Sequence, residues 1–123
     1  MRHKQYQHID PLVMLNAVGK DLDAFRSLSK TFLRLAPPMF ERLEGAIMAG
    51  DRKASLHEVH SLKGTTSLIG AGQLTELLKD IEGLLWREAQ GGFVQYVPEL
   101  TRLFGLVMQE VRASVVDFQG DLG

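Results

Sequence analysis

The chain has 123 residues, 45% hydrophobic and 24% charged, a composition typical of one globular domain and unlike that of disordered chains. Its formal net charge is -1 with both signs interspersed, so nothing indicates a nucleic-acid-binding surface or a polybasic membrane patch. Cysteine is absent, which excludes disulfides, thiolate metal sites and cysteine nucleophiles. No stretch approaches the roughly 18 uninterrupted apolar residues of a membrane span. We therefore expect a cytoplasmic, single-domain protein.

Residues 1–9 form a polar segment without the apolar run of a signal peptide, and we interpret them as a tail. Asp10 and Pro11 then predict the start of a short helix, because Asp caps free N–H groups and Pro suits the first helical position. Gly19 predicts its end.

A second helical pattern covers residues 21–50, with apolar side chains three or four positions apart. Pro37 and Pro38 interrupt it. Because proline lacks the N–H and clashes with the preceding turn, a kink or a break is expected near Ala36. The sequence does not decide between one bent helix and two.

Three further helices are predicted at residues 51–69, 74–90 and about 96–118, and residues 119–123 are expected to fray. No segment shows a strand-like period bounded by turn residues. Four long amphipathic helices with short connections favour an all-α fold, an antiparallel four-helix bundle with a short additional N-terminal helix. The domain would span residues 10–118.

The segment 51–69 carries the residues that suggest chemistry. Its predicted buried stripe consists of residues three or four positions apart, namely Leu56, Val59, Leu62, Thr66 and Ile69. The opposite face then carries Lys53, His57, His60, Gly64 and Ser67, with Lys63 alongside. This arrangement directs His60 toward solvent.

Gly64 is unusual because a glycine inside a helix costs about 1 kcal/mol relative to alanine. Either a neighbouring helix packs closely there, or the missing side chain keeps His60 accessible, since positions four apart are neighbours. Imidazole can act as a nucleophile toward a phosphoryl group, and Lys63 could supply positive charge to its oxygens. Taken singly, an exposed histidine and a surface lysine are usually without function.

Residues 60–71 closely resemble the signature of histidine phosphotransfer (HPt) domains of bacterial phosphorelays; they read His60-Ser61-Leu62-Lys63-Gly64-Thr65-Thr66-Ser67-Leu68-Ile69-Gly70-Ala71. The likeness extends over about residues 10–115. It implies a carrier that accepts a phosphoryl group on the outer ring nitrogen of His60 and passes it on. Lys63 would steady the phosphoryl charge, and Gly64 would leave room for the partner.

The resemblance also implies partners: response-regulator receiver domains, and a sensor or hybrid histidine kinase. Lys53, His57, Ser67 and Leu68 are candidate partner-binding residues, although Leu68 could instead complete the core stripe. We expect no cofactor or metal on this chain, with Mg²⁺ on the receiver. Nothing resembles an ATP-binding kinase module, so no autonomous kinase activity is expected. The polar face around His60 favours a monomer.

Other functions remain possible. His57 and His60 lie at positions i and i+3 and could bind a metal, but a third ligand is missing and Glu58 points elsewhere. The main alternative is a non-catalytic adaptor that binds receivers without phosphorylation. A phosphoacceptor domain of a chemotaxis-type kinase uses the same chemistry. The sequence does not reveal the partners, the direction of transfer, or whether these residues belong to a larger hybrid kinase.

Overall fold

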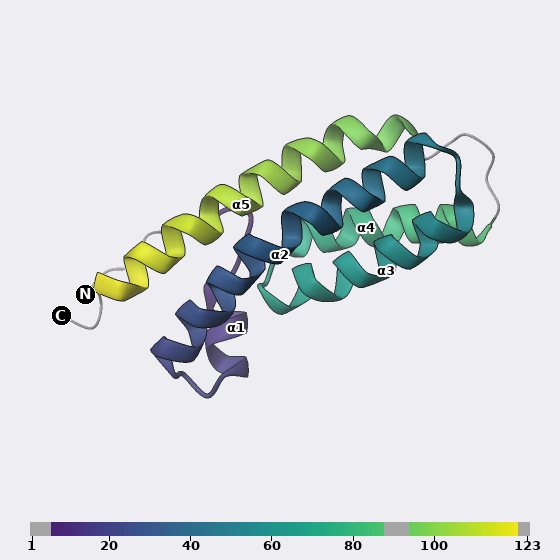
Figure 1. Ribbon diagram of the computed structural model, residues 1–123. Helices are drawn as coiled ribbons and strands as arrows, with labels where there is room; N and C mark the ends of the chain where they lie inside the picture. The colour runs from purple at the N-terminus through teal and green to yellow at the C-terminus, as the bar shows by residue number, and fades with distance from the viewer. Residues whose placement is uncertain (1–5, 88–93, 121–123) are drawn as a thin grey trace.

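The computed structural model describes residues 6–87 and 94–120. Within them the elements are α1 (Pro11–Ala17), α2 (Leu22–Met48), α3 (Arg52–Leu68), α4 (Gly72–Trp86), a 3-10 turn η1 (Val94–Tyr96) and α5 (Val97–Gly120). The described part contains no strand, which confirms the all-α class. Successive long helices run in opposite directions, and α1 lies beside the N-terminal half of α2, where α3 ends and α4 begins (Figure 1).

Three predicted helix starts, at residues 10, 21 and 51, are confirmed by their caps. The side chains of Asp10, Asp21 and Asp51 accept hydrogen bonds from backbone N–H groups in the first turns of α1, α2 and α3. Aspartate stabilises a helix start because it satisfies a donor that has no partner within the helix and because its charge opposes the helix dipole.

Of the two outcomes expected near Ala36, a kink or a break, the break does not occur, because α2 is one helix of 27 residues that includes Pro37 and Pro38. The prolines leave the carbonyls of Leu33 and Arg34 without their usual donors. Pro38 and Arg34 are exposed, so water can reach this side of the helix. The buried side of α2 stays in register on both sides of the prolines, with Phe32, Ala36, Phe40 and Leu43.

One hydrophobic core joins all four long helices. Aromatic pairs connect α2 and α5. The rings of Phe40 and Phe104 stack with centroids 4.4 Å apart, and the ring centroids of Phe25 and Phe118 are 4.9 Å apart. In α3 the predicted stripe is buried except for Leu56, which is only partly covered. Thr66, also buried, has its hydroxyl satisfied by the Lys63 carbonyl at 3.1 Å and by the Thr75 hydroxyl of α4 at 2.8 Å.

The turn between α3 and α4 anchors the N-terminal part of the chain. Gly70 adopts φ +74°, and a Cβ there would overlap the backbone of Asp10, so only glycine fits. The Asp10 N–H donates to the Gly70 carbonyl at 3.0 Å. This close approach fixes α1 against the end of the α3–α4 pair.

The ends of the elements differ somewhat from the predicted ones. Helix α4 ends at Trp86, earlier than expected, and α5 continues to Gly120. Residues 1–5, 88–93 and 121–123 lie outside the described residues, including most of the predicted polar tail. The last residues of the predicted tail pack on the helical domain, because Ile9 is buried in the core and His8 binds Glu110 of α5. None of the described helices is long and apolar enough to cross a membrane.

Candidate functional site

The residues singled out on α3 lie together on its outer side. Lys53, His57, His60, Gly64 and Ser67 are all exposed, as their spacing predicted. The His60 side chain is 73% exposed. Because α3 packs on α2 and α4 through its other side, no described residue buries these side chains, and a partner can reach them.

Glu82 of α4 reaches the edge of this face and binds two of its residues. Its Oε2 lies 3.1 Å from His60 Nδ1, and its Oε1 lies 2.6 Å from Lys63 Nζ. The carboxylate side chain is 15% exposed, whereas Lys63 is 25% exposed. One carboxylate therefore holds both the imidazole and the ammonium group.

Sequence reasoning missed this role of Glu82, which lies 22 residues after His60. A signal was present, because Glu82 follows the buried Ile81 in a helix that must pack beside α3. Periodicity places a residue on the side of a helix, but it does not say which residue of the next helix stands opposite. That requires the register between α3 and α4.

The pKa of Glu82 is lowered, chiefly by the hydrogen bond from Lys63; burial opposes this shift, and the hydrogen bond from His60 adds to it. Glu82 is therefore ionised at neutral pH. An ionised carboxylate can only accept hydrogen bonds, so His60 Nδ1 must carry a proton. In neutral His60 the lone pair is then on Nε2, the outer ring nitrogen, which is the nucleophilic form.

Gly64 lies four residues after His60, beside it on the exposed face. A Cβ built at Gly64 would meet nothing within 4 Å, apart from the helix's own nearby backbone. Close packing of another described helix therefore does not explain this glycine, and its expected role in access to His60 stays a prediction. Leu68 is 44% exposed and thus does not complete the core stripe.

The metal alternative gains no support from the surroundings of His57 and His60. Across residues 6–87 and 94–120, no group of three or more His, Cys, Asp or Glu residues is arranged to hold a metal ion. Glu58, which lies between the two histidines in sequence, accepts a hydrogen bond from Arg42 Nε of α2 at 3.3 Å.

Comparisons with known proteins point to one family. The model of the Hpt domain family matches residues 27–114. The chain is also similar to the crystal structure of histidine-containing phosphotransfer protein B (HptB) from Pseudomonas aeruginosa PAO1, with a TM-score of 0.80 and 25% sequence identity. That match covers 90% of this chain and 96% of HptB. No curated protein matched. Because the family model covers more than half of the chain and includes the His60 helix, the chain belongs to the Hpt domain family.

Proposed function

We propose that this chain is a phosphorelay carrier that accepts a phosphoryl group on His60 Nε2 from a receiver-domain aspartate and passes it to another receiver domain. The observation that carries the proposal is the contact between Glu82 and His60 Nδ1, because it leaves an exposed lone pair on Nε2. Family membership supports a phosphotransfer role in general.

In the proposed step, the Nε2 lone pair attacks the phosphorus of the receiver's aspartyl phosphate. The N–P bond forms, the P–O bond to the aspartate breaks, and its electrons leave with the carboxylate. The proton on Nδ1 stays in place, so the ring gains positive charge as the bond forms. Glu82 stabilises that charge and holds the ring orientation, as a carboxylate does for a catalytic imidazole. Transfer to the next receiver is the reverse of this step.

Lys63 has two tasks in this proposal. Before transfer it neutralises Glu82, whose charge would otherwise repel the incoming phosphoryl group. After transfer, the phosphoryl oxygens compete with Glu82 for the ammonium group, which serves as a point-charge partner for phosphate.

The receiver would cover the exposed face of α3. Gly64 leaves space beside His60, while Lys53, His57, Ser67 and Leu68 are the proposed contact residues. The basic and apolar side chains of this set complement an acidic pocket with an apolar rim. Mg²⁺ would be held by the receiver, where it neutralises the phosphoryl oxygens. We further propose a monomer that works in the cytoplasm with receivers and a sensor or hybrid kinase.

A transfer assay tests the proposal. Receiver domains labelled with radioactive phosphate are mixed with the chain, and with His60→Gln and His8→Gln variants. The wild type and His8→Gln should take up an acid-labile, base-stable label, and His60→Gln should not. A chain that binds receivers but never takes up label would support the adaptor instead.

A further inference from the structure

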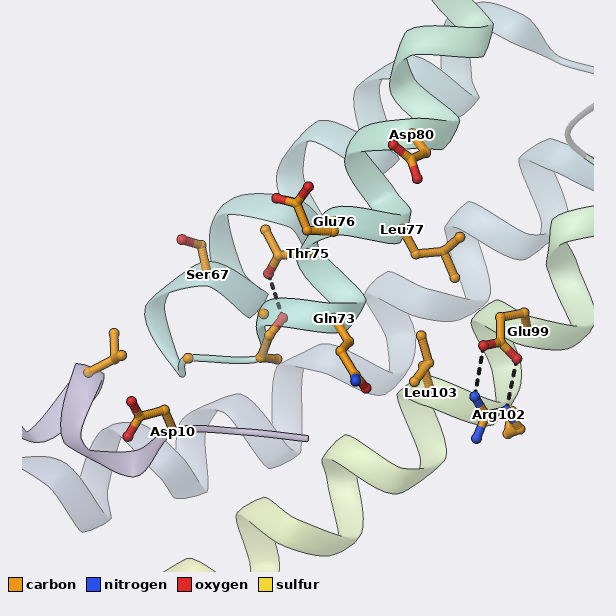
Figure 2. Close-up of a pocket in the computed structure, with 14 residues that line it drawn as sticks. Asp10, Ser67, Gln73, Thr75, Glu76, Leu77, Asp80, Glu99, Arg102 and Leu103 are labelled. Atoms are coloured by element: carbon orange, nitrogen blue, oxygen red, sulfur yellow. Dashed lines mark hydrogen bonds and ion pairs between the residues drawn. The ribbon is translucent and has the colours of Figure 1, made fainter. Parts of the chain in front are cut away.

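A groove lies on the side of α4 that faces α5, away from His60. Its volume is about 820 Å³, and it extends from the start of α1 past the α3–α4 turn and between α4 and the first turns of α5. Figure 2 shows Glu76 and Asp80 along one wall, Glu99 and Arg102 along the other, and Leu77 with Leu103 between them.

The groove faces away from the phosphoryl-acceptor site because of the helical geometry of α4. At about 100° per residue, Asp80 lies about 160° around the helix from Glu82, and Glu76 about 120°. The two sites therefore use different sides of α4. They approach each other only near Ser67, which lines the groove and lies about 10 Å along α3 from His60 at 1.5 Å per residue.

The charge of the groove is strongly one-sided although the protein as a whole is nearly neutral. Asp10, Glu76, Asp80 and Glu99 contribute four negative charges and Arg102 one positive charge, giving a net of -3. Two of the acids are engaged, since Asp10 caps α1 and Glu99 binds Arg102 at 2.7 Å. Glu76 is exposed and contacts Lys79 only at 3.7 Å. Asp80 is exposed and forms no ion pair in the described part of the chain.

Apolar side chains line parts of the groove, with the polar Gln73 beside them. Leu77 is partly buried and Leu103 is only 5% exposed, whereas Val13 lines the α1 end with a side chain that is 42% exposed. An acidic rim around these apolar side chains fits an amphipathic helix whose apolar residues face inward and whose basic residues reach the rim.

The charge changes sign toward the far end of α4. A smaller hollow of about 300 Å³ shares Asp80 with the groove and is lined by Lys79, Arg87 and Tyr96. Basic residues of an occupant should therefore lie near Glu76 and Asp80 and not near Arg87. This polarity sets one direction for a helix along α4.

We propose that this groove is a second docking surface, which binds a basic amphipathic helix of a partner protein while His60 remains free for a receiver. The proposal does not depend on phosphorylation of His60. It assigns to α4 two separate sides, one that orients the imidazole and one that binds a partner.

The test uses the full chain labelled with ¹⁵N and a synthetic peptide of about the length of α4, which has 15 residues. The peptide carries leucines at helical spacing and lysines elsewhere; a scrambled peptide of equal charge is the control. Amide shifts should change at Gln73, Leu77 and Leu103, and the scrambled peptide should bind more weakly. Shift changes spread over all faces of the protein would overturn the proposal.

Matched charge reversals sharpen the test. Asp80→Lys and Glu41→Lys each change the net charge by +2 at an exposed helical position. Asp80→Lys should weaken peptide binding about tenfold or more, because like charges would meet at the rim, whereas Glu41→Lys should change it by less than about twofold. If both variants weakened peptide binding equally, the peptide would be held by the overall charge of the protein, and the groove would not be its binding site.

The same samples separate this proposal from the proposed function. His60 labelling by a phosphorylated receiver should persist when peptide saturates the groove. Labelling without peptide but none with it would contradict a separate docking surface, while leaving the carrier role intact. Peptide binding in a chain that never takes up label would reject the carrier role alone.

Discussion

Two histidine–glutamate pairs in this molecule have similar geometry and different surroundings. His60 Nδ1 lies 3.1 Å from Glu82, and His8 Nδ1 lies 2.8 Å from Glu110. The His60 side chain is 73% exposed, whereas that of His8 is 16% exposed. A carboxylate beside an imidazole therefore does not by itself indicate a reactive histidine. The imidazole must also be exposed, so that a partner can reach its second ring nitrogen.

The two carboxylates also have different partners. Among the described residues, Glu82 binds only side chains, those of His60 and Lys63. Glu110 additionally accepts hydrogen bonds from the backbone N–H groups of His8 at 2.8 Å and Ile9 at 3.2 Å. It therefore holds the N-terminal segment against α5. The contacts of Glu82 with two side chains can rearrange during a reaction without moving the backbone. The contacts of Glu110, by contrast, hold the N-terminal segment in place and are part of the fold.

The largest expected effect separates the two histidines. His60→Gln should abolish phosphoryl uptake, because the amide provides no nucleophilic nitrogen, and should change stability by less than about 0.5 kcal/mol at this exposed site. His8→Gln should keep full uptake. Autoradiography of both variants measures phosphoryl uptake, and urea unfolding measures their stability. Loss of uptake in His8→Gln would contradict the proposed difference between the two histidines.

The next effect concerns Glu82. Glu82→Gln should slow transfer about 10- to 100-fold, because the amide no longer enforces a proton on Nδ1 or stabilises the charged ring. Receiver binding should stay within about twofold, since Glu82 is largely covered. Single-turnover kinetics distinguish the two quantities. An unchanged transfer rate would show that Glu82 only ties α4 to α3.

Glu110→Gln should act on stability and not on transfer. It weakens the acceptor of several hydrogen bonds, for which a loss of about 2 kcal/mol is expected. The midpoint of thermal unfolding should fall by several degrees, while His60 labelling per folded molecule stays constant. A Glu76→Gln variant, altered at an exposed acid, is the control and should unfold like the wild type.

Gly64→Ala should give opposite effects on stability and transfer. Alanine is a better helix former by about 1 kcal/mol, and its Cβ would enter open space, so the free energy of unfolding should rise. Transfer should slow because the methyl group narrows the approach to His60. Gly105→Ala in α5, where a Cβ also meets nothing within 4 Å, is the control and should leave transfer unchanged.

Acid should weaken both carboxylate pairs. The pKa of Glu82 lies below its ordinary value of 4.5, and so does that of Glu110, where burial raises it but hydrogen bonds from His8 and Gln7 outweigh that effect. Each group therefore contributes stability that is present above pH 4.5 and is lost as pH falls through the lower, folded-state pKa. Urea unfolding from neutral pH downward should show this loss, and Glu110→Gln should show less of it.

Much of the fold could be predicted from local signals. Asp10, Asp21 and Asp51 marked helix starts because capping is a local interaction. The continuity of α2 could not be predicted, because it depends on how the helix packs on either side of Pro37 and Pro38.

The site was predictable in part for the same reason. The shared face of His60 and Gly64 follows from helical spacing alone, and the resemblance implied that His60 is the acceptor. Glu82 and the pairing of His8 with Glu110 depend on contacts between segments distant in sequence, which periodicity does not specify.

The most direct test of the central claim is to locate the phosphoryl group on the His60 ring. The chain, labelled with ¹⁵N on histidine, is phosphorylated by a receiver and observed by ¹⁵N and ³¹P NMR. We predict that the phosphorus is coupled to Nε2 of His60 and that Nδ1 retains its proton. Phosphorus on Nδ1, or on a residue other than His60, would contradict the orientation of the ring by Glu82.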